Sequence, residues 1–266
     1  MSGATTRIQF VDVDARRIRH QVLGDGDQAV VMVHGFGGCL EHWSANQAAL
    51  AAGGRRVAAL DLPGHGDSSV DVGSGSLDAL AECVRGYLDA TAIERVHLVG
   101  HSMGAAVCLA LADVVPDRVQ SLTLVGPAGT GQKIDADFIR RFIAARGRDE
   151  IASLMRLLFA DPERIPEVLL QQTVAYKQRP GIVEALARIA SSRYASTPSG
   201  RALRDVLGTV PTLVIWGGAD AIIPPPAPGE LQRDGVTLHV LPGRGHMVQI
   251  EAAGDVNRLV DEFLRR

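Results

Sequence analysis

Three side chains, a serine, an aspartate and a histidine, each follow a run of apolar residues and could together perform nucleophilic catalysis. Ser102 stands in the sequence GHSMG at 100–104, directly after VHLV at 96–99. Asp220 follows PTLVIWGGA, and His246 follows VTLHVLPGRG. A serine hydroxyl is a poor nucleophile near neutral pH, so it needs a nearby base and an acid that orients that base. We therefore predict a catalytic triad in which Ser102 is the nucleophile, His246 the base and Asp220 the acid.

The glycines around Ser102 indicate a tight turn between a strand and a helix. Gly100 and Gly104 lie two residues before and two residues after the serine, the spacing of a nucleophile elbow. We expect strained backbone angles at Ser102 and no room for a Cβ at either glycine. A helix that begins at the serine directs its free N–H groups and its positive dipole end toward a developing oxyanion. The alternative interpretation is a glycine-rich turn whose serine only caps the helix.

Acyl chemistry also requires an oxyanion hole with two backbone donors. The Met103 N–H group at the predicted helix start is one candidate, and the Phe36 N–H group in HGFGG at 34–38 is the other. The glycines of this segment let the backbone approach a ligand closely. Other histidines in nearby loops are expected to organise those loops by hydrogen bonds: His34, His65 and His101.

The elements that must position these residues alternate between apolar strands and helices. Such alternation predicts an α/β fold with a mostly parallel, eight-stranded sheet and helices on both faces. The first two strands have the alternating pattern of an antiparallel edge hairpin. Ligands bind beyond the carboxyl ends of parallel strands, where the candidate residues fall, whereas Asp61 is expected to hold its own loop. The predicted strands are 7–11, 16–23, 29–33, 57–60, 96–99, 119–125, 211–216 and 236–241.

From 132 to 208 the strand pattern stops, and a helical cap is predicted between residues 1–131 and 209–266, which form the α/β core. The cap is therefore inserted before the last two strands. Its predicted helices are 135–146, 149–160, 165–177 and 180–195, and a last helix of the core is predicted over 249–265. The candidates for a substrate cavity beneath the cap are Phe138, Phe142, Met155, Leu158, Phe159 and Tyr176, with Met247 beside the histidine. The alternative is that these cap residues only hold the cap together.

Composition narrows the classes of partner. The 266 residues carry a net charge of −3 and are 46% hydrophobic, which favours a large apolar core and gives no electrostatic case for nucleic acid or an anionic membrane. Three cysteines without metal-like spacing predict reduced thiols and a cytoplasmic setting. We expect no signal peptide, membrane span, metal or cofactor, and we leave a homodimer as a possibility.

Taken together, these motifs resemble the α/β-hydrolase superfamily over nearly the whole chain. The resemblance rests on HGFGG at 34–38, DLPGHGDS at 61–68, GHSMG at 100–104, Asp220 and GRGH at 243–246. In closer detail the chain is similar to the hydrolase-like domain of acetoin dehydrogenase acetyltransferase components. Stretches such as VVMVHGFGG, AYKQRPG, PTLVIWG and GHMVQIEAAGDVNRLVDEFL carry this similarity. Members of that family carry a lipoyl domain ahead of this one, and the present sequence shows no lipoyl-type segment.

The sequence therefore predicts a serine hydrolase that acts on a small or medium apolar ester, lactone or related acyl compound through an acyl-enzyme. The similarity to the acetoin family implies an acyltransferase as an alternative. A further resemblance to meta-cleavage-product hydrolases implies C–C bond hydrolysis, for which Arg188 or Arg193 could be the cap arginine that binds a substrate carboxylate. A non-catalytic ligand-binding protein is the remaining alternative.

Overall fold

The structure is a computed structural model that describes residues 8–191 and 197–266. Arg193, the last residues of the cap helix predicted over 180–195, and residue 7 of the predicted hairpin lie outside the described residues. The described strands are β1 (Ile8–Val13), β2 (Arg16–Leu23), β3 (Ala29–Val33), β4 (Arg56–Leu60), β5 (Val96–His101), β6 (Val119–Val125), β7 (Thr212–Gly217) and β8 (Val236–Leu241).

These strands form one sheet in the order β1-β2-β4-β3-β5-β6-β7-β8. Strand β2 pairs antiparallel with both of its neighbours, and every pair from β4 to β8 is parallel. The eight-stranded, mostly parallel sheet with an antiparallel edge hairpin is therefore confirmed. The central strands β3 and β5 are buried along their whole length, as expected for runs of β-branched and aliphatic residues covered on both faces.

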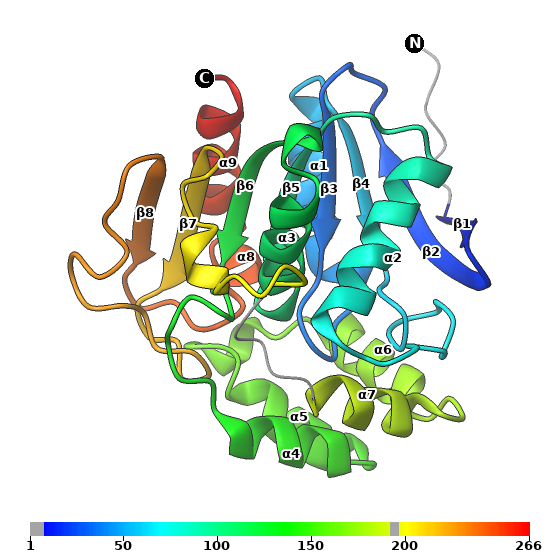
Figure 1. The fold of residues 1–266 in the computed structure, drawn as a ribbon. Helices are drawn as coiled ribbons and strands as arrows, with labels where there is room; N and C mark the ends of the chain where they lie inside the picture. Colours follow the sequence, from blue (N-terminus) through cyan, green and yellow to red (C-terminus); the bar gives the residue numbers. More distant parts are fainter. Residues whose placement is uncertain (1–7, 192–196) are drawn as a thin grey trace.

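Helices cover both faces of this sheet (Figure 1). Helices α2 and α3 close one hydrophobic cluster, which contains Tyr87 and Leu109, and helices α1 and α9 close the cluster on the other face, which contains Trp43 and Val260. The helices are α1 (Ser44–Ala52), α2 (Leu77–Ala90), α3 (Met103–Val114), α4 (Ala136–Ala144), α5 (Arg148–Arg156), α6 (Glu167–Lys177), α7 (Ile182–Ala190), α8 (Val248–Glu251) and α9 (Ala253–Leu264). Short 3-10 turns are η1 (Leu40–Trp43), η2 (Pro116–Arg118), η3 (Pro162–Arg164) and η4 (Leu203–Asp205).

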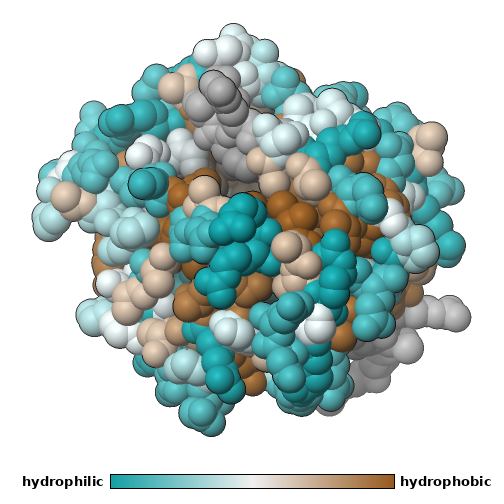
Figure 2. Space-filling model, turned by 90° about the horizontal axis from the view of Figure 1, so that it is seen from below, coloured by the Kyte–Doolittle hydropathy of each residue, from teal (hydrophilic) through white to brown (hydrophobic). Residues whose placement is uncertain are grey.

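Helices α4 to α7 and their connections, residues 136–190, are the part of the chain that we call the cap. The cap follows β6 and precedes β7, as predicted, and lies beyond the strand ends at which β3 and β5 finish (Figure 1). Figure 2 looks onto its outer side, where hydrophobic side chains appear between polar ones. Leu157 and Val168 are among the large apolar side chains exposed in the cap. In the described part of the chain, none of the helices combines the length and the hydropathy that a bilayer crossing requires.

The helix predicted over 180–195 is shorter, Ile182–Ala190, and two other predicted helices differ near the candidate site. The helix predicted over 149–160 ends at Arg156, and the next residues turn so that the N–H groups of Ala160 and Asp161 reach the Glu251 carboxylate. The helix predicted over 249–265 is two helices, because Ala252 leaves the helical region with φ −131° and ψ 42°. Both departures occur beside the loop that carries His246.

Candidate active site

Ser102 occupies the strained turn that the sequence predicts. Its φ of 52° and ψ of −116° place a non-glycine residue on the left-handed side of the backbone map, between the end of β5 and the start of α3. Its backbone N–H group donates to the Val125 oxygen over 2.9 Å, and its carbonyl accepts from Ala128 over 3.1 Å. The end of β6 therefore holds the turn in its strained form.

The flanking glycines are required by close packing. A Cβ at Gly104 would lie 2.3 Å from the Val33 oxygen at the end of β3, and a Cβ at Gly100 would lie 2.6 Å from the Gly104 oxygen. A Cβ at Gly35 would lie 3.1 Å from the Ser102 Cβ atom. The loop 34–38 therefore runs against the serine, and Phe36, the next residue in that loop, joins Ser102 in lining one cavity.

The side chains of His246 and Asp220 meet beneath the same cavity. His246 Nδ1 lies 2.7 Å from Asp220 Oδ2, and the two residues are each 4% exposed. A carboxylate can only accept, so Nδ1 carries the proton and Nε2 is left as an acceptor. The other carboxylate oxygen of Asp220 accepts from the N–H groups of Ile222 and Ile223, each over 2.8 Å. Asp220 is therefore held from both sides in one orientation.

Ser102 and His246 line one apolar cavity of about 40 Å³ beneath the cap. Of the predicted lining residues, the structure places five there: Phe138, Phe142, Met155, Leu158 and Met247. Sequence reasoning missed several others: His42, Ile134, Ile139, Thr173 and Ile222. Ile134 and Ile222 belong to irregular loops, whose side-chain directions no sequence period reveals.

Two predicted lining residues, Phe159 and Tyr176, do not line this cavity. Phe159 is buried, but it follows the early end of α5, so it does not share the helical face of Met155. Tyr176 lies one turn beyond Thr173 on α6, and its ring stacks on His65 with 6.4 Å between centroids. Tyr176 lines a neighbouring cavity of about 290 Å³, which also contacts Thr173.

The histidines nearest to the predicted triad are uncharged. Burial lowers the pKa of His42 to about 4 and moves the pKa of His101 well below its usual value. His101 Nε2 lies 3.0 Å from the His246 carbonyl oxygen, to which it donates. His34 Nδ1 donates to the Gly35 oxygen, and its Nε2 accepts from Leu62 N over 3.0 Å. His34 and His101 therefore organise loops through hydrogen bonds, as expected.

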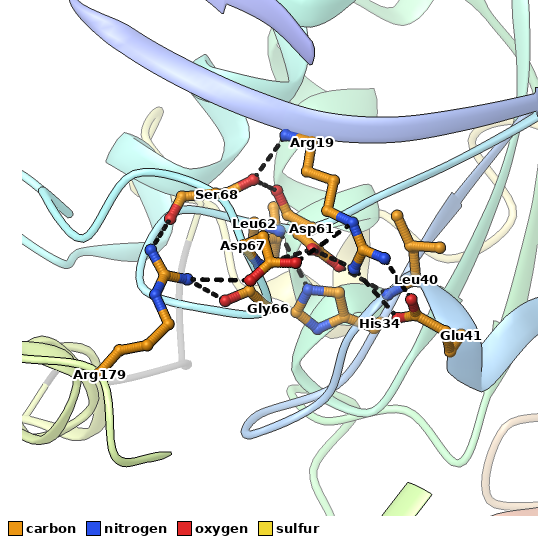
Figure 3. A network of polar contacts seen from close by, with 10 residues as sticks. All are labelled: Arg19, His34, Leu40, Glu41, Asp61, Leu62, Gly66, Asp67, Ser68 and Arg179. Atoms are coloured by element: carbon orange, nitrogen blue, oxygen red, sulfur yellow. Dashed lines mark hydrogen bonds and ion pairs between the residues drawn. The ribbon is translucent and has the colours of Figure 1, made fainter. Parts of the chain in front are cut away.

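Asp61 connects the surrounding loops (Figure 3). Its carboxylate accepts from Leu40 N over 2.7 Å and from Asp67 N over 2.9 Å, and forms a 3.1 Å ion pair with Arg19. Burial raises the pKa of Asp61 to about 6, although the Arg19 guanidinium opposes this shift. On the cap side, Arg179 donates to the Ser68 carbonyl oxygen over 3.1 Å. Asp61 thus holds the loop at the end of β4, as predicted, and Arg179 joins that loop to the cap (Figure 3).

Lys177, at the end of α6, supports one wall of the cavity. It is 3% exposed, its ammonium donates to the Phe142 carbonyl oxygen, and Nζ lies 4.2 Å from the centroid of the Phe142 ring. A Cβ at Gly37 would lie 2.4 Å from that ring, so Phe142 also presses on loop 34–38. Burial and the nearby Arg146 lower the pKa of Lys177 to about 8, while Glu150 opposes the shift.

This pKa has a consequence for stability. Because the folded-state pKa of Lys177 lies below the ordinary lysine value of 10.5, the unfolded chain binds more protons between these two pH values, and the stability rises with pH there. The unfolding free energy of the wild type, minus that of Lys177→Met, is expected to increase by about 2 kcal/mol from about pH 7 to pH 9.5. Urea unfolding of both proteins measures this difference, with the exposed Lys133→Met as control. A difference that stays constant with pH would contradict the expectation.

Sequence reasoning also missed Glu251, which is 3% exposed and accepts hydrogen bonds from both the cap and the His246 loop. A glutamate in a predicted helix is ordinarily exposed to solvent, so the sequence gives no indication that Glu251 is buried. In the described part of the chain, no group of three or more His, Cys, Asp or Glu side chains is placed to hold a metal ion.

Comparisons with known proteins agree with this architecture. The family model described as "alpha/beta hydrolase fold" matches residues 28–253. The chain is 43% identical to the dihydrolipoyllysine-residue acetyltransferase component of the acetoin cleaving system of Pseudomonas putida, over 97% of this chain and 69% of that protein. It is 32% identical to the 2-hydroxy-6-oxo-6-phenylhexa-2,4-dienoate hydrolase of Comamonas testosteroni, over 98% of this chain and 95% of that protein.

A solved structure is similar throughout its length. The solved structure of the 2-hydroxy-6-oxo-6-phenylhexa-2,4-dienoate hydrolase from Rhodococcus sp. strain RHA1 superposes on this chain with a TM-score of 0.85. The two are 26% identical, and the match covers 98% of this chain and all of that chain. Both the fold and the order of the elements are therefore shared. The chain belongs to the α/β-hydrolase fold family and is a relative of the acetoin-cleaving acetyltransferase components in its hydrolase-like part.

Proposed function

We propose that this chain is a serine hydrolase that cleaves a small or medium, uncharged acyl compound, an ester or lactone, through an acyl-enzyme at Ser102. The observation that carries the proposal is the strained Ser102 in one apolar cavity with His246, whose Nδ1 is bonded to the buried Asp220. This is the arrangement that activates a hydroxyl by proton transfer to imidazole.

The reaction proceeds in two halves. Ser102 Oγ attacks the acyl carbon while His246 Nε2 takes the hydroxyl proton, and Asp220 stabilises the imidazolium that forms. The N–H groups of Met103 and Phe36 stabilise the oxyanion, and His246 then protonates the leaving group. Water then gives a proton to the same imidazole and attacks the acyl carbon of the acyl-enzyme. The bond to Ser102 Oγ breaks, the imidazolium returns the proton to Oγ, and the acid is released.

The charge of the cavity favours a neutral substrate. Its described lining contains neither arginine nor lysine, and His42 and His101 are uncharged. Relatives named as dienoate or dienedioate hydrolases act on carboxylates by those names, and a buried carboxylate without a partner is costly. Arg188, one of the two candidate cap arginines, donates to the Gly73 oxygen over 3.0 Å in an exposed position instead.

The uncharged lining of the cavity predicts a strong preference for uncharged acyl groups. With two esters of equal acyl chain length, one acyl chain ending in a methyl group and one in a carboxylate, kcat/KM is expected to be at least about 100-fold higher for the methyl form, which corresponds to about 3 kcal/mol. Steady-state hydrolysis of both compounds measures the ratio. Faster cleavage of the carboxylate form would contradict the preference for uncharged acyl groups, and faster cleavage of a C–C bond in a dienoate would replace ester hydrolysis with the C–C bond reaction.

Acyl transfer is the second candidate, and the similarity to the acetoin-system components favours it. It shares acylation of Ser102 and differs only in the acceptor, a thiol in place of water. Adding dihydrolipoamide to the assay distinguishes the two. Formation of the acyl thioester at the expense of free acid supports transfer, and unchanged acid formation supports hydrolysis.

A further inference from the structure

The loop that carries His246 is joined to the cap by one buried carboxylate. Glu251 Oε1 accepts from Ala160 N over 2.9 Å and from Asp161 N over 3.1 Å. Its other oxygen, Oε2, accepts from Gly245 N over 2.5 Å. The same side chain therefore contacts the residue directly before His246 and a cap segment about 90 positions earlier in the sequence. We call residues 158–161 the cap turn.

Further contacts hold the two segments together on the other side of His246. Met247 N donates to the Leu158 oxygen of the cap turn over 3.0 Å. Gly245 approaches the cap turn so closely that a Cβ there would lie 2.6 Å from Ala160 N. The residues before and after His246 are thus both bonded to the cap turn, directly or through Glu251.

The cap turn also contacts the space where a substrate binds. Leu158, whose carbonyl receives the Met247 N–H group, lines the cavity together with Ser102 and His246. A group that packs against Leu158 therefore touches the same hydrogen-bonded unit that holds the histidine. The cap wall and the imidazole cannot be displaced independently while these bonds persist.

A carboxylate at this position does more than fill space. Removing its charge from water is costly, and an apolar side chain of similar volume could close the same contact. Charge-assisted hydrogen bonds are about twice as strong as neutral ones, and they impose direction on their donors. Three backbone N–H groups converging on Glu251 therefore set the position of Gly245 relative to Ala160 and Asp161.

We propose that Glu251 is a positioning residue for His246, and that through Glu251 the position of the imidazole depends on the position of the cap turn. This inference rests on the proposed function, in which His246 is the base. Glu251 itself does not touch the reacting atoms. Its effect reaches them through Gly245, whose displacement would move the neighbouring imidazole away from Ser102.

The test is Glu251→Gln, which preserves the volume of the side chain but replaces one carboxylate oxygen by an N–H₂ group. That group then faces either the N–H group of Gly245 or the N–H groups of Ala160 and Asp161, which lose their acceptor. We expect kcat for a neutral ester to fall about 10- to 100-fold, because small misplacements of catalytic groups have effects of this size, with KM changed less than about threefold. Glu262→Gln, an exposed change on α9, is the matched control. A rise in KM at unchanged kcat would assign Glu251 to the cap alone and overturn the proposal.

A second measurement separates positioning from general loosening of the structure. In a His246→Ala background, Glu251→Gln is expected to leave the residual rate unchanged within about twofold, since the group it positions is gone. An equal loss in both backgrounds would contradict the proposal. If the Gln variant does not fold, amide exchange of the wild type decides: fast exchange at Gly245 and Ala160 would overturn the proposal, and strong protection supports it.

The proposed function can fail separately. Full activity of a Ser102→Ala variant would reject the serine mechanism. An inactive Ser102→Ala variant together with a Glu251→Gln variant as active as Glu262→Gln would reject only the role of Glu251.

Discussion

Replacing Ser102 with alanine is expected to lower kcat for a neutral short-chain ester by at least about 10⁴-fold while the protein stays folded. Triads of this type lose on the order of 10⁶ in kcat when the nucleophile is removed, and the remaining rate comes from the oxyanion hole and binding. Alanine keeps the Cβ atom and both backbone hydrogen bonds of Ser102, to Val125 and Ala128. The strained turn therefore persists without its hydroxyl.

Steady-state kinetics and covalent labelling by a fluorophosphonate measure the effect, and thermal unfolding checks the fold. Ser153→Ala, an exposed change on α5, is the matched control and is expected to keep full activity and labelling. More than a tenth of wild-type kcat in Ser102→Ala would place the nucleophile elsewhere, and labelling of that variant would identify the residue concerned.

The second large effect is expected for Asp220→Asn, which should lower kcat by about 10⁴-fold. The Asp220 carboxylate accepts from His246 Nδ1 on one oxygen and from the Ile222 and Ile223 N–H groups on the other. An asparagine has one accepting oxygen, so either the imidazole or the loop meets an N–H₂ group. If that group faces the imidazole, His246 adopts the tautomer with the proton on Nε2, which cannot take the serine proton.

The matched control is Asp61→Asn, because Asp61 is also a buried carboxylate at a strand end and it pairs with Arg19. We expect this variant to lose stability and to retain kcat within about tenfold in the folded fraction. A loss of tenfold or less in Asp220→Asn would point to another acid, and a loss of about 10⁴-fold in Asp61→Asn would identify that acid.

The sequence predicted the parts of the site that depend on regular elements. Buried parallel strands appear as continuous apolar runs, so the ends of β5 and β7 could be located, and with them the loops of Ser102 and Asp220. Strand β8 is a half-buried edge strand, and its apolar positions alternate with Thr237 and His239, which located the loop of His246. The required glycines at 100 and 104 were likewise visible, because a strand-to-helix turn leaves no room for a Cβ.

The rest could not be predicted, because it depends on contacts between distant segments. Helix α5 ends early because the N–H groups of Ala160 and Asp161 donate to the Glu251 carboxylate, about 90 residues away in sequence, instead of continuing the helix. That early end turns Phe159 out of the expected face. The position of Tyr176 in its helix is compatible with a residue that lines the cavity. Its ring instead stacks on His65, which belongs to a distant loop, and the local sequence does not indicate that contact.

The small size of the cavity beneath the cap has a consequence for binding equilibria. About 40 Å³ holds a few water molecules at most, so an acyl group cannot enter until the lining side chains or the cap have moved outward. The measured affinity is then the intrinsic affinity multiplied by the fraction of molecules that are open. A substitution in the cap can consequently tighten binding without adding any contact to the substrate, simply because it makes the open form more common.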